Sequence, residues 1–300
     1  TSLGGFPAAY AETQAEYMAS GKATEQEKLV AGCPEYAFNE YLQIGLEQGL
    51  VGLALFIGWL GLLFYKGIKN KRYACCGGLM SLAIFAFSSY PLQLPEFWVV
   101  LIFLGVMSVT PDKDEIRENQ AESNGHRWGK QIFFMGIAIL GIGLFWMQKD
   151  HYKAYQQWNK AQMFYNNKAY EAALEVYEPL YPLLKHKPEF LFEAAQSLSK
   201  TGQYEKANEY LERAVLLSSD PMLYYVMAKN EQCLGEYRQA EKHLLHAIDI
   251  LPERIYPYYL LMNLYTEPSY FQPAKLKMAI DSVLTKKPKV ESSAIKEMKE

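Results

Sequence analysis

Apolar residues gather in four long stretches in the first half of this chain and recur at helical spacing through the second half. The four stretches carry no formal charge and cover residues 48–65, 73–95, 97–111 and 131–148. A helix needs about 17 to 25 residues to cross the hydrocarbon core of a membrane, so three of the stretches are long enough. The stretch 97–111 is short and is expected to include residues of the preceding turn. The pattern predicts transmembrane helices at about 46–65, 73–90, 94–110 and 131–148.

The second and third of these helices are separated only by the turn from Pro91 to Pro95. Glu96 is the single charged residue between 73 and 111, and it lies beside that turn. We therefore expect a helical hairpin with its tip in the membrane interface. A re-entrant hairpin is the alternative, and both forms return the chain to the side from which it entered.

The orientation follows from the cations of the short loops, because Lys and Arg stay on the cytoplasmic side. Residues 66–72 carry four cations and residues 111–130 carry another four, whereas residues 1–45 carry two and the hairpin tip none. The loops 66–72 and 111–130 are thus predicted to be cytoplasmic. Residues 1–45 and the part from about 151 onward are predicted to lie on the opposite, extracytoplasmic side.

Residues 151–300 are polar and contain an internal repeat. An aromatic residue recurs at intervals of 34, 33 and 34, an alanine follows it after three residues, and further alanines precede it by nine. The aromatic residues are Tyr170, Tyr204, Tyr237 and Phe271, and the alanines are Ala173, Ala207, Ala240, Ala274, Ala161, Ala195 and Ala228. Two helices can cross closely where the side chain is only a methyl group. The pattern resembles tetratricopeptide repeats and predicts a solenoid of about four helical pairs.

Stacked repeats of this kind form a concave face that can capture a peptide or a partner protein. A spacer or a dimerisation element is the alternative for residues 151–300. His243 and His246 are interpreted as part of a solvated helix face, because a metal site would need further ligands. No metal and no cofactor is expected, and nothing in the repeats has the geometry of catalysis.

The charge balance limits the classes of partner that the chain can bind. The net charge is −3 over 300 residues and zero over residues 151–300, where nineteen Lys and Arg meet nineteen Asp and Glu. Such a balance leaves no basic face of the size that binds phosphate backbones, so nucleic acid is excluded as a partner. The four cysteines, Cys33, Cys75, Cys76 and Cys233, include no CxxC pair and leave the redox compartment undecided.

The polar residues before the first apolar stretch fall on one helical stripe, at Tyr36, Glu40, Gln43 and Glu47. Pro34 suits the first turn of a helix. The spacing predicts one continuous helix from this polar segment into the membrane.

The segment "AFNEYLQIGLEQGLVGLALF" resembles the end of the large periplasmic loop in the O-antigen ligase and polymerase superfamily. The family motif H-N-x-x-L-x-x-x-x-E-x-G is matched at Asn39, Leu42, Glu47 and Gly49, while Phe38 replaces the histidine. The resemblance implies a multi-pass protein of the bacterial inner membrane with periplasmic repeats. It implies metal-independent transfer of a glycan from an undecaprenyl diphosphate carrier to lipid A core, a growing polymer or a protein.

The same resemblance implies the site. Glu40, Asn39 and Glu47 would be catalytic by steering an acceptor hydroxyl, and Tyr41, Gln43 and Tyr17 would bind substrate. Each also has a structural interpretation: Asn39 can hold the loop, Glu40 can favour the helix N-terminus, and Glu47 can lie among headgroups.

Cations that hold the diphosphate are expected upstream, so we expect this chain to be the C-terminal part of a longer enzyme and inactive alone. A non-enzymatic, membrane-anchored repeat scaffold for periplasmic protein interaction is the alternative. The fold class expected in either case is all-α, with a polytopic transmembrane segment followed by a tetratricopeptide solenoid.

Overall fold

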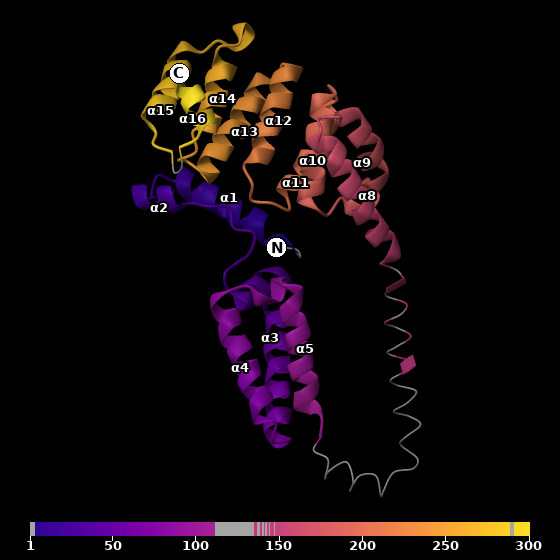
Figure 1. Cartoon of the computed structure of the whole chain (residues 1–300). Helices are drawn as coiled ribbons and strands as arrows, with labels where there is room; N and C mark the ends of the chain where they lie inside the picture. Colours follow the sequence, from indigo (N-terminus) through magenta and orange to yellow (C-terminus); the bar gives the residue numbers. More distant parts are fainter. Residues whose placement is uncertain are drawn as a thin grey trace, which may run out of the picture. The chain divides into compact units, whose positions relative to one another are not determined.

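The computed structural model describes residues 4–111, 135–136, 139, 141, 143, 145–146, 148–288 and 291–300. All regular elements in these ranges are helices, which confirms the all-α prediction (Figure 1). The contacts divide the chain into an apolar unit, Thr1–Phe6 with Tyr36–Asp150, and a repeat unit, Pro7–Glu35 with His151–Glu300. The expected segment 1–45 is therefore divided, because its residues 7–35 pack with the repeats.

The apolar unit contains the helices α3 (Glu40–Lys69), α4 (Tyr73–Ser88) and α5 (Pro95–Val109), with a short 3₁₀ turn, η1 (Pro91–Gln93), between the last two. Leucines from all of these elements form one buried cluster: Leu63, Leu79, Leu82, Leu92 and Leu101. Each of α4 and α5 packs against α3 and against the other. The hairpin predicted around Pro91 to Pro95 is thus present as α4, η1 and α5.

The first helix differs from its prediction at two places. It begins at Glu40, capped by Asn39, so Pro34 lies outside it and not in its first turn. Gly49 interrupts the helix with φ 73° and ψ 179°, a conformation in the left-handed region that favours glycine. The polar segment and the apolar segment are therefore joined across a kink and do not form one continuous helix.

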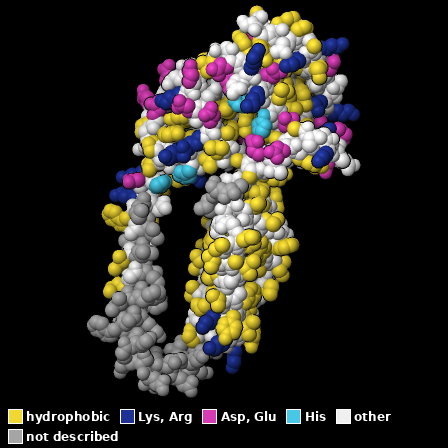
Figure 2. Space-filling model, turned by 180° about the vertical axis from the view of Figure 1, so that it is seen from behind, with side chains coloured by type: hydrophobic (Ala, Val, Ile, Leu, Met, Phe, Trp, Pro, Cys, Tyr) yellow, Lys and Arg dark blue, Asp and Glu magenta, His cyan; other side chains and the backbone are white. Residues whose placement is uncertain are grey.

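The outer surface of the apolar unit is hydrophobic. Leu50, Val51 and Leu55 of α3 are 81%, 74% and 70% exposed, and Figure 2 shows hydrophobic side chains over most of the α3–α5 surface in view. Exposed apolar area of this extent marks a surface that meets lipid or another protein.

Only α3 is long and apolar enough to span a membrane among the helices that the structure describes. The 20 residues of α3 after the Gly49 kink reach about 30 Å, whereas the 16 residues of α4 and the 15 of α5 reach about 24 and 22 Å. The hydrocarbon core is about 30 Å thick. The polytopic arrangement is thus not shown, and most of the predicted span 131–148 lies outside the described residues.

The repeat unit contains four consecutive helix pairs and a short terminal helix. The first helices of the pairs are α8 (Lys149–Asn166), α10 (Pro188–Lys200), α12 (Met222–Leu234) and α14 (Tyr256–Tyr265). The second helices are α9 (Tyr170–Leu184), α11 (Tyr204–Val215), α13 (Tyr237–Ile250) and α15 (Pro273–Thr285), and a 3₁₀ turn, η2 (Pro268–Tyr270), precedes α15. The C-terminal helix is α16 (Ser293–Lys299). Three of the four predicted aromatic residues begin second helices, as the repeat spacing requires.

The alanines of the repeat fill the crossings between helices. Ala173, Ala207 and Ala240 are completely buried, and Ala161, Ala195 and Ala228 are at most 2% exposed. Gly202 and Gly235 occupy the turns within the second and third pairs with φ of 81° and 79°. Lys168 holds the equivalent place in the first pair with φ 61°, so the first turn takes the same left-handed form without glycine.

The fourth pair departs from the repeat. Phe271 lies before α15 and is 58% exposed, and Ala274 is exposed as well. Ala279 and Val283 are the buried residues of α15. The alignment of Phe271 and Ala274 with the other repeats is therefore correct in spacing but wrong in packing, because η2 changes the approach of the chain to α15.

Two helices that precede the apolar unit in sequence, α1 (Phe6–Ala19) and α2 (Glu25–Val30), belong to this second unit. Ala11, Ala15 and Ala31 share a buried cluster with Ile250 and Leu251, at the end of α13. α2 is stabilised by a capping box in which Thr24 and Glu27 satisfy each other's backbone amides.

Candidate functional site

The structure brings five of the six predicted site residues together at the beginning of α3. Asn39 is the N-cap, and its side-chain oxygen accepts a hydrogen bond from the Leu42 amide at 3.0 Å. Glu40, Tyr41, Gln43 and Glu47 lie in the first two turns after it. Asn39 thus has N-cap geometry, a structural role different from the loop-holding one expected from the sequence.

Glu40 is almost completely enclosed, with 1% of its surface exposed. One carboxylate oxygen accepts from the Leu92 amide at 2.7 Å, and the other accepts from the Gln93 side-chain amide at 3.3 Å. Both partners belong to η1, so Glu40 ties the start of α3 to the tip of the hairpin. A carboxylate in this position holds the fold of the apolar unit.

The neighbouring polar groups also have partners inside the apolar unit. The Gln43 amide donates to Glu47 at 2.7 Å, and its oxygen accepts from the Ala37 amide at 2.7 Å. The Tyr41 hydroxyl donates to the Ala83 carbonyl of α4 at 3.0 Å. Of the two predicted site carboxylates, Glu47 accepts fewer hydrogen bonds from the described residues than Glu40 does.

Tyr17 does not join this group. It lies on α1 in the repeat unit, where its hydroxyl donates to Glu27 of α2 at 3.1 Å. That hydrogen bond, with the nearby Glu27 charge, raises the pKa of Tyr17. The pKa of Glu27 is lowered by the hydrogen bonds from Thr24 and, after them, by the one from Tyr17. In this structure Tyr17 joins α1 to α2.

A polar and aromatic stripe runs along the first helices of the repeat. We call it the first-helix face and define it by Tyr155, Trp158, Gln162, Tyr165, Glu193, Gln196, Lys229, Gln232 and Tyr256. Gln196 accepts a hydrogen bond from the Tyr165 hydroxyl, and the Lys229 ammonium lies 2.5 Å from the Tyr256 hydroxyl and 5.1 Å from that ring. These contacts place the first helices of the first two pairs side by side, and those of the last two pairs likewise. Tyr155 and Lys229 are exposed, and the other members of the face are half-buried.

Two carboxylates hold neighbouring pairs together and were missed in the sequence. Glu193 of α10 accepts from Trp158 at 2.7 Å, from Gln162 at 2.8 Å and from the Tyr177 hydroxyl at 3.0 Å. Glu241 of α13, 8% exposed, has an equivalent role toward the fourth pair. Their sequence signal is an acidic residue beside the apolar stripe of a helix.

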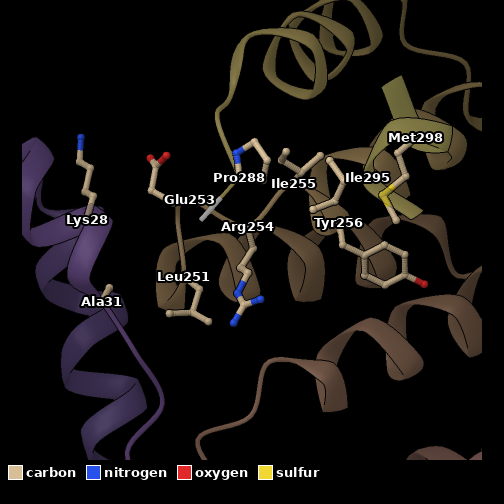
Figure 3. A pocket seen from close by; sticks show the side chains of 10 residues that line it. All are labelled: Lys28, Ala31, Leu251, Glu253, Arg254, Ile255, Tyr256, Pro288, Ile295 and Met298. Carbon is tan, nitrogen blue, oxygen red and sulfur yellow. The ribbon is translucent and has the colours of Figure 1, made fainter. Parts of the chain in front are cut away.

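A pocket with a volume of about 290 Å³ lies at the corner between α13 and α14 (Figure 3). Lys28 and Ala31 form one side, Arg254 and Tyr256 the floor, and Ile295 with Met298 of α16 the opposite side. Its walls come from three segments far apart in the sequence. Most of its charges are paired, since Lys28 contacts Glu25 at 2.8 Å and Glu253 contacts Lys286 at 3.0 Å.

The two histidines of α13 face carboxylates. His243 lies 2.9 Å from Glu231, and His246 lies 3.1 Å from Glu12 of α1. No group of three metal-ligating side chains occurs among the residues that the structure describes. The pairing of His246 with α1 was not foreseen, because the two residues are 234 positions apart.

A family model described as "Anaphase-promoting complex, cyclosome, subunit 3" matches residues 166–247, from the turn before α9 into α13. This is a family of tetratricopeptide-type repeats. The match supports a tetratricopeptide-type repeat over residues 166–247, and the helix pairs of the structure continue the same paired-helix arrangement on either side of it. Among curated proteins, none matches the chain significantly.

Solved structures similar to the chain include MamA protein, which is 18% identical over 43% of this chain and 70% of that one, with a TM-score of 0.39. MamA from Desulfovibrio magneticus RS-1 is 17% identical over 48% of this chain and 75% of that one, with a TM-score of 0.39. The Yersinia enterocolitica type III secretion chaperone SycD, in complex with a peptide of the translocator YopD, is 19% identical over 42% of this chain and 90% of that one, with a TM-score of 0.34.

Proposed function

We propose that this protein is a membrane-anchored scaffold whose tetratricopeptide-type repeats bind a partner protein. The observation that carries the proposal is the first-helix face, where aromatic rings and amide groups lie side by side over consecutive pairs. Such side chains supply apolar contact area with a polar end, the combination found at protein interfaces. α3, with its exposed leucines, supplies the anchor.

The placement of this scaffold is part of the proposal. The cations at 66–72 gather at one end of the apolar unit, as Figure 2 shows, and favour a cytoplasmic position for that end. We place the chain in a bacterial inner membrane, with the repeats in the periplasm. Membrane lipid is then a contact of the α3–α5 surface.

Site-directed photo-cross-linking in the living host tests the binding face. A photoreactive residue at Tyr155 or Lys229 is expected to form a discrete adduct with one protein. The matched control is Leu216, at the end of α11, which is 68% exposed and outside the first-helix face. Equal adducts from Leu216 and Tyr155, or adducts from neither, would refute the binding face.

A second candidate function rests on the motif at the start of α3. In it, the chain is the C-terminal part of a glycosyltransferase of the O-antigen ligase type that uses an undecaprenyl-diphosphate-linked glycan. The observation in its favour is that Gly49, the last residue of the motif, is where α3 leaves helical geometry, two residues after Glu47. The motif glycine thus has a backbone role that a simple membrane anchor does not need.

Surface glycan measured in the full-length protein's host separates the two candidates. For a transferase, Glu47→Gln is expected to reduce the glycan at unchanged protein level. Glu96→Gln, on α5, is the control for loss of one carboxylate near the membrane. A normal amount of surface glycan in the Glu47→Gln strain would refute the transferase function. The variants Asn39→Ala and Glu40→Gln test it only where the variant protein still folds.

A further inference from the structure

Residues 7–35 occupy a docking surface on the repeats. The Gln14 side-chain amide donates to the Ile250 carbonyl at 2.8 Å, and Glu12 accepts from the Tyr224 hydroxyl at 3.2 Å. The Ser219 hydroxyl donates to the Pro34 carbonyl at 3.4 Å. Polar contacts thus connect this segment to the third helix pair and to the connection that precedes it.

Apolar packing accompanies these hydrogen bonds. Ala11 and Ala15, one turn apart on α1, are 4% and 3% exposed because they lie in a cluster with Ile250 and Leu251. The small side chains let α1 approach the end of α13 closely. Tyr224 is half-buried in the same cluster, and burial, followed by the Glu12 charge, raises its pKa.

The segment that docks here leads directly into α3. Only four residues separate Glu35, the last residue of the docked segment, from Glu40 at the start of α3. Groups that hydrogen-bond at about 3 Å cannot lie on opposite sides of a hydrocarbon core of about 30 Å. If α3 crosses a membrane, the repeats must be on the side where α3 begins.

We infer that the repeats hold residues 7–35 of their own chain, and that the polypeptide between Tyr36 and Asp150 crosses the membrane an even number of times. The surface around Tyr224, His246 and Ile250 is then closed to partners in trans. The docking does not depend on the first-helix face, so its test is independent of the test of the proposed scaffold function.

Thiol cross-linking of the full chain in its membrane tests the docking. In a background with the native cysteines replaced by serine, Glu12→Cys with His246→Cys is expected to cross-link within one chain through a short bismaleimide. Thr13→Cys with His246→Cys is the matched control, since Thr13 is exposed and is rotated by about 100° around α1. Equal yields for the two pairs, or a cross-link only between two chains, would overturn the docking in cis.

Sided labelling tests the even crossing number. Chains with a single cysteine at Lys22→Cys, native Cys233 or native Cys75 are treated with a membrane-impermeant maleimide before and after permeabilisation. Lys22→Cys and Cys233 are expected to react in the same compartment, and Cys75, near the other end of α3, in the opposite one. Reaction of Lys22→Cys and Cys233 in different compartments would overturn the inference. Reaction of Cys75 in the same compartment as Lys22→Cys and Cys233 would show that α3 does not cross the membrane.

Discussion

Glu241 of α13 forms an ion pair with Lys275 of α15, with 2.6 Å between the carboxylate oxygen and the ammonium nitrogen. The same carboxylate accepts from the hydroxyls of Tyr265 at 2.7 Å and Tyr270 at 2.6 Å. These three donors come from α14, η2 and α15. One buried acid therefore attaches the whole irregular fourth pair to the third.

Replacing Glu241 by alanine is expected to destabilise the repeat unit by about 2 to 3 kcal/mol, because a buried charged acceptor is lost and two tyrosine hydroxyls lose their partner. Urea unfolding followed by circular dichroism measures the change. Glu236→Ala, at the exposed start of α13, is the control and is expected to change stability by less than about 0.5 kcal/mol. Similar losses in both variants would contradict the role of Glu241.

The same site predicts a pH dependence. Burial alone would raise the pKa of Glu241, but hydrogen bonds from Lys275, Tyr270 and Tyr265 outweigh it and hold this pKa below the ordinary value of 4.5. The folded state then binds the proton less readily than the unfolded state. The stability that the ionised carboxylate contributes is complete above pH 4.5 and is lost as the pH falls through the lowered pKa.

The difference in melting temperature between the wild-type protein and Glu241→Gln isolates this contribution, since the other carboxylates titrate in both. We expect a large difference at pH 7 that shrinks below pH 4.5. A difference that stays constant down to pH 3 would show that the Glu241 charge contributes nothing.

Lys168 is expected to be a site of stabilisation. Its φ of 61° costs a non-glycine residue energy that Gly202 and Gly235 avoid at the equivalent turns. Lys168→Gly should raise the free energy of unfolding by up to about 1 kcal/mol, after the extra entropy that glycine gives the unfolded chain is subtracted. The reciprocal variant Gly202→Ala should lower it by about 1 kcal/mol, although no heavy atom lies within 4 Å of the added Cβ.

The buried alanines predict a contrast between repeats. Ala207→Leu inserts a larger side chain into a crossing with no exposed surface and is expected to cost about 1 to 3 kcal/mol or more. Ala274→Leu at the same repeat position of the fourth pair is exposed and should change stability by less than about 0.5 kcal/mol. Thermal unfolding of both variants checks this, and a costly Ala274→Leu would mean that α15 packs like the other second helices.

In the apolar unit, Glu40→Ala is expected to be more destabilising than Glu47→Ala. Removal of the Glu40 carboxylate leaves the Leu92 amide without an acceptor in a buried place, which costs about 1 to 3 kcal/mol. Among the described residues, the Glu47→Ala change removes the hydrogen bond from the Gln43 amide. The fraction of folded protein after heating in detergent distinguishes them, and equal sensitivity of the two variants would argue against the link from α3 to η1.

Much of the repeat unit could be predicted because its determinants are local and repeated. The spacing of Tyr170, Tyr204 and Tyr237 places the start of three second helices, and the alanines three residues later are buried as the pattern requires. Phe271 shows the limit. Its spacing is right, yet the turn at Pro268 changes the packing, and no residue-by-residue pattern contains that change.

The sequence places the candidate site residues at the start of α3, but it does not give their hydrogen-bond partners. Sequence spacing put Glu40 and Glu47 on one stripe, but it could not show that Glu40 is enclosed by the hairpin tip while Glu47 accepts a hydrogen bond from Gln43. The partner of Glu40 is 52 residues away, and contacts at such separation depend on how the helices pack.

The sequence by itself determined the all-helical class, the register of the repeats and the apolar character of the α3–α5 surface, because each follows from periodicity and side-chain type along a short stretch. Only the tertiary structure decided the kink at Gly49, the burial of Glu241 and the docking of residues 7–35 on the third helix pair. The burial of Glu241 and the docking of residues 7–35 join residues far apart in the chain, and their energy comes from hydrogen bonds and packing that exist only after the helices have assembled.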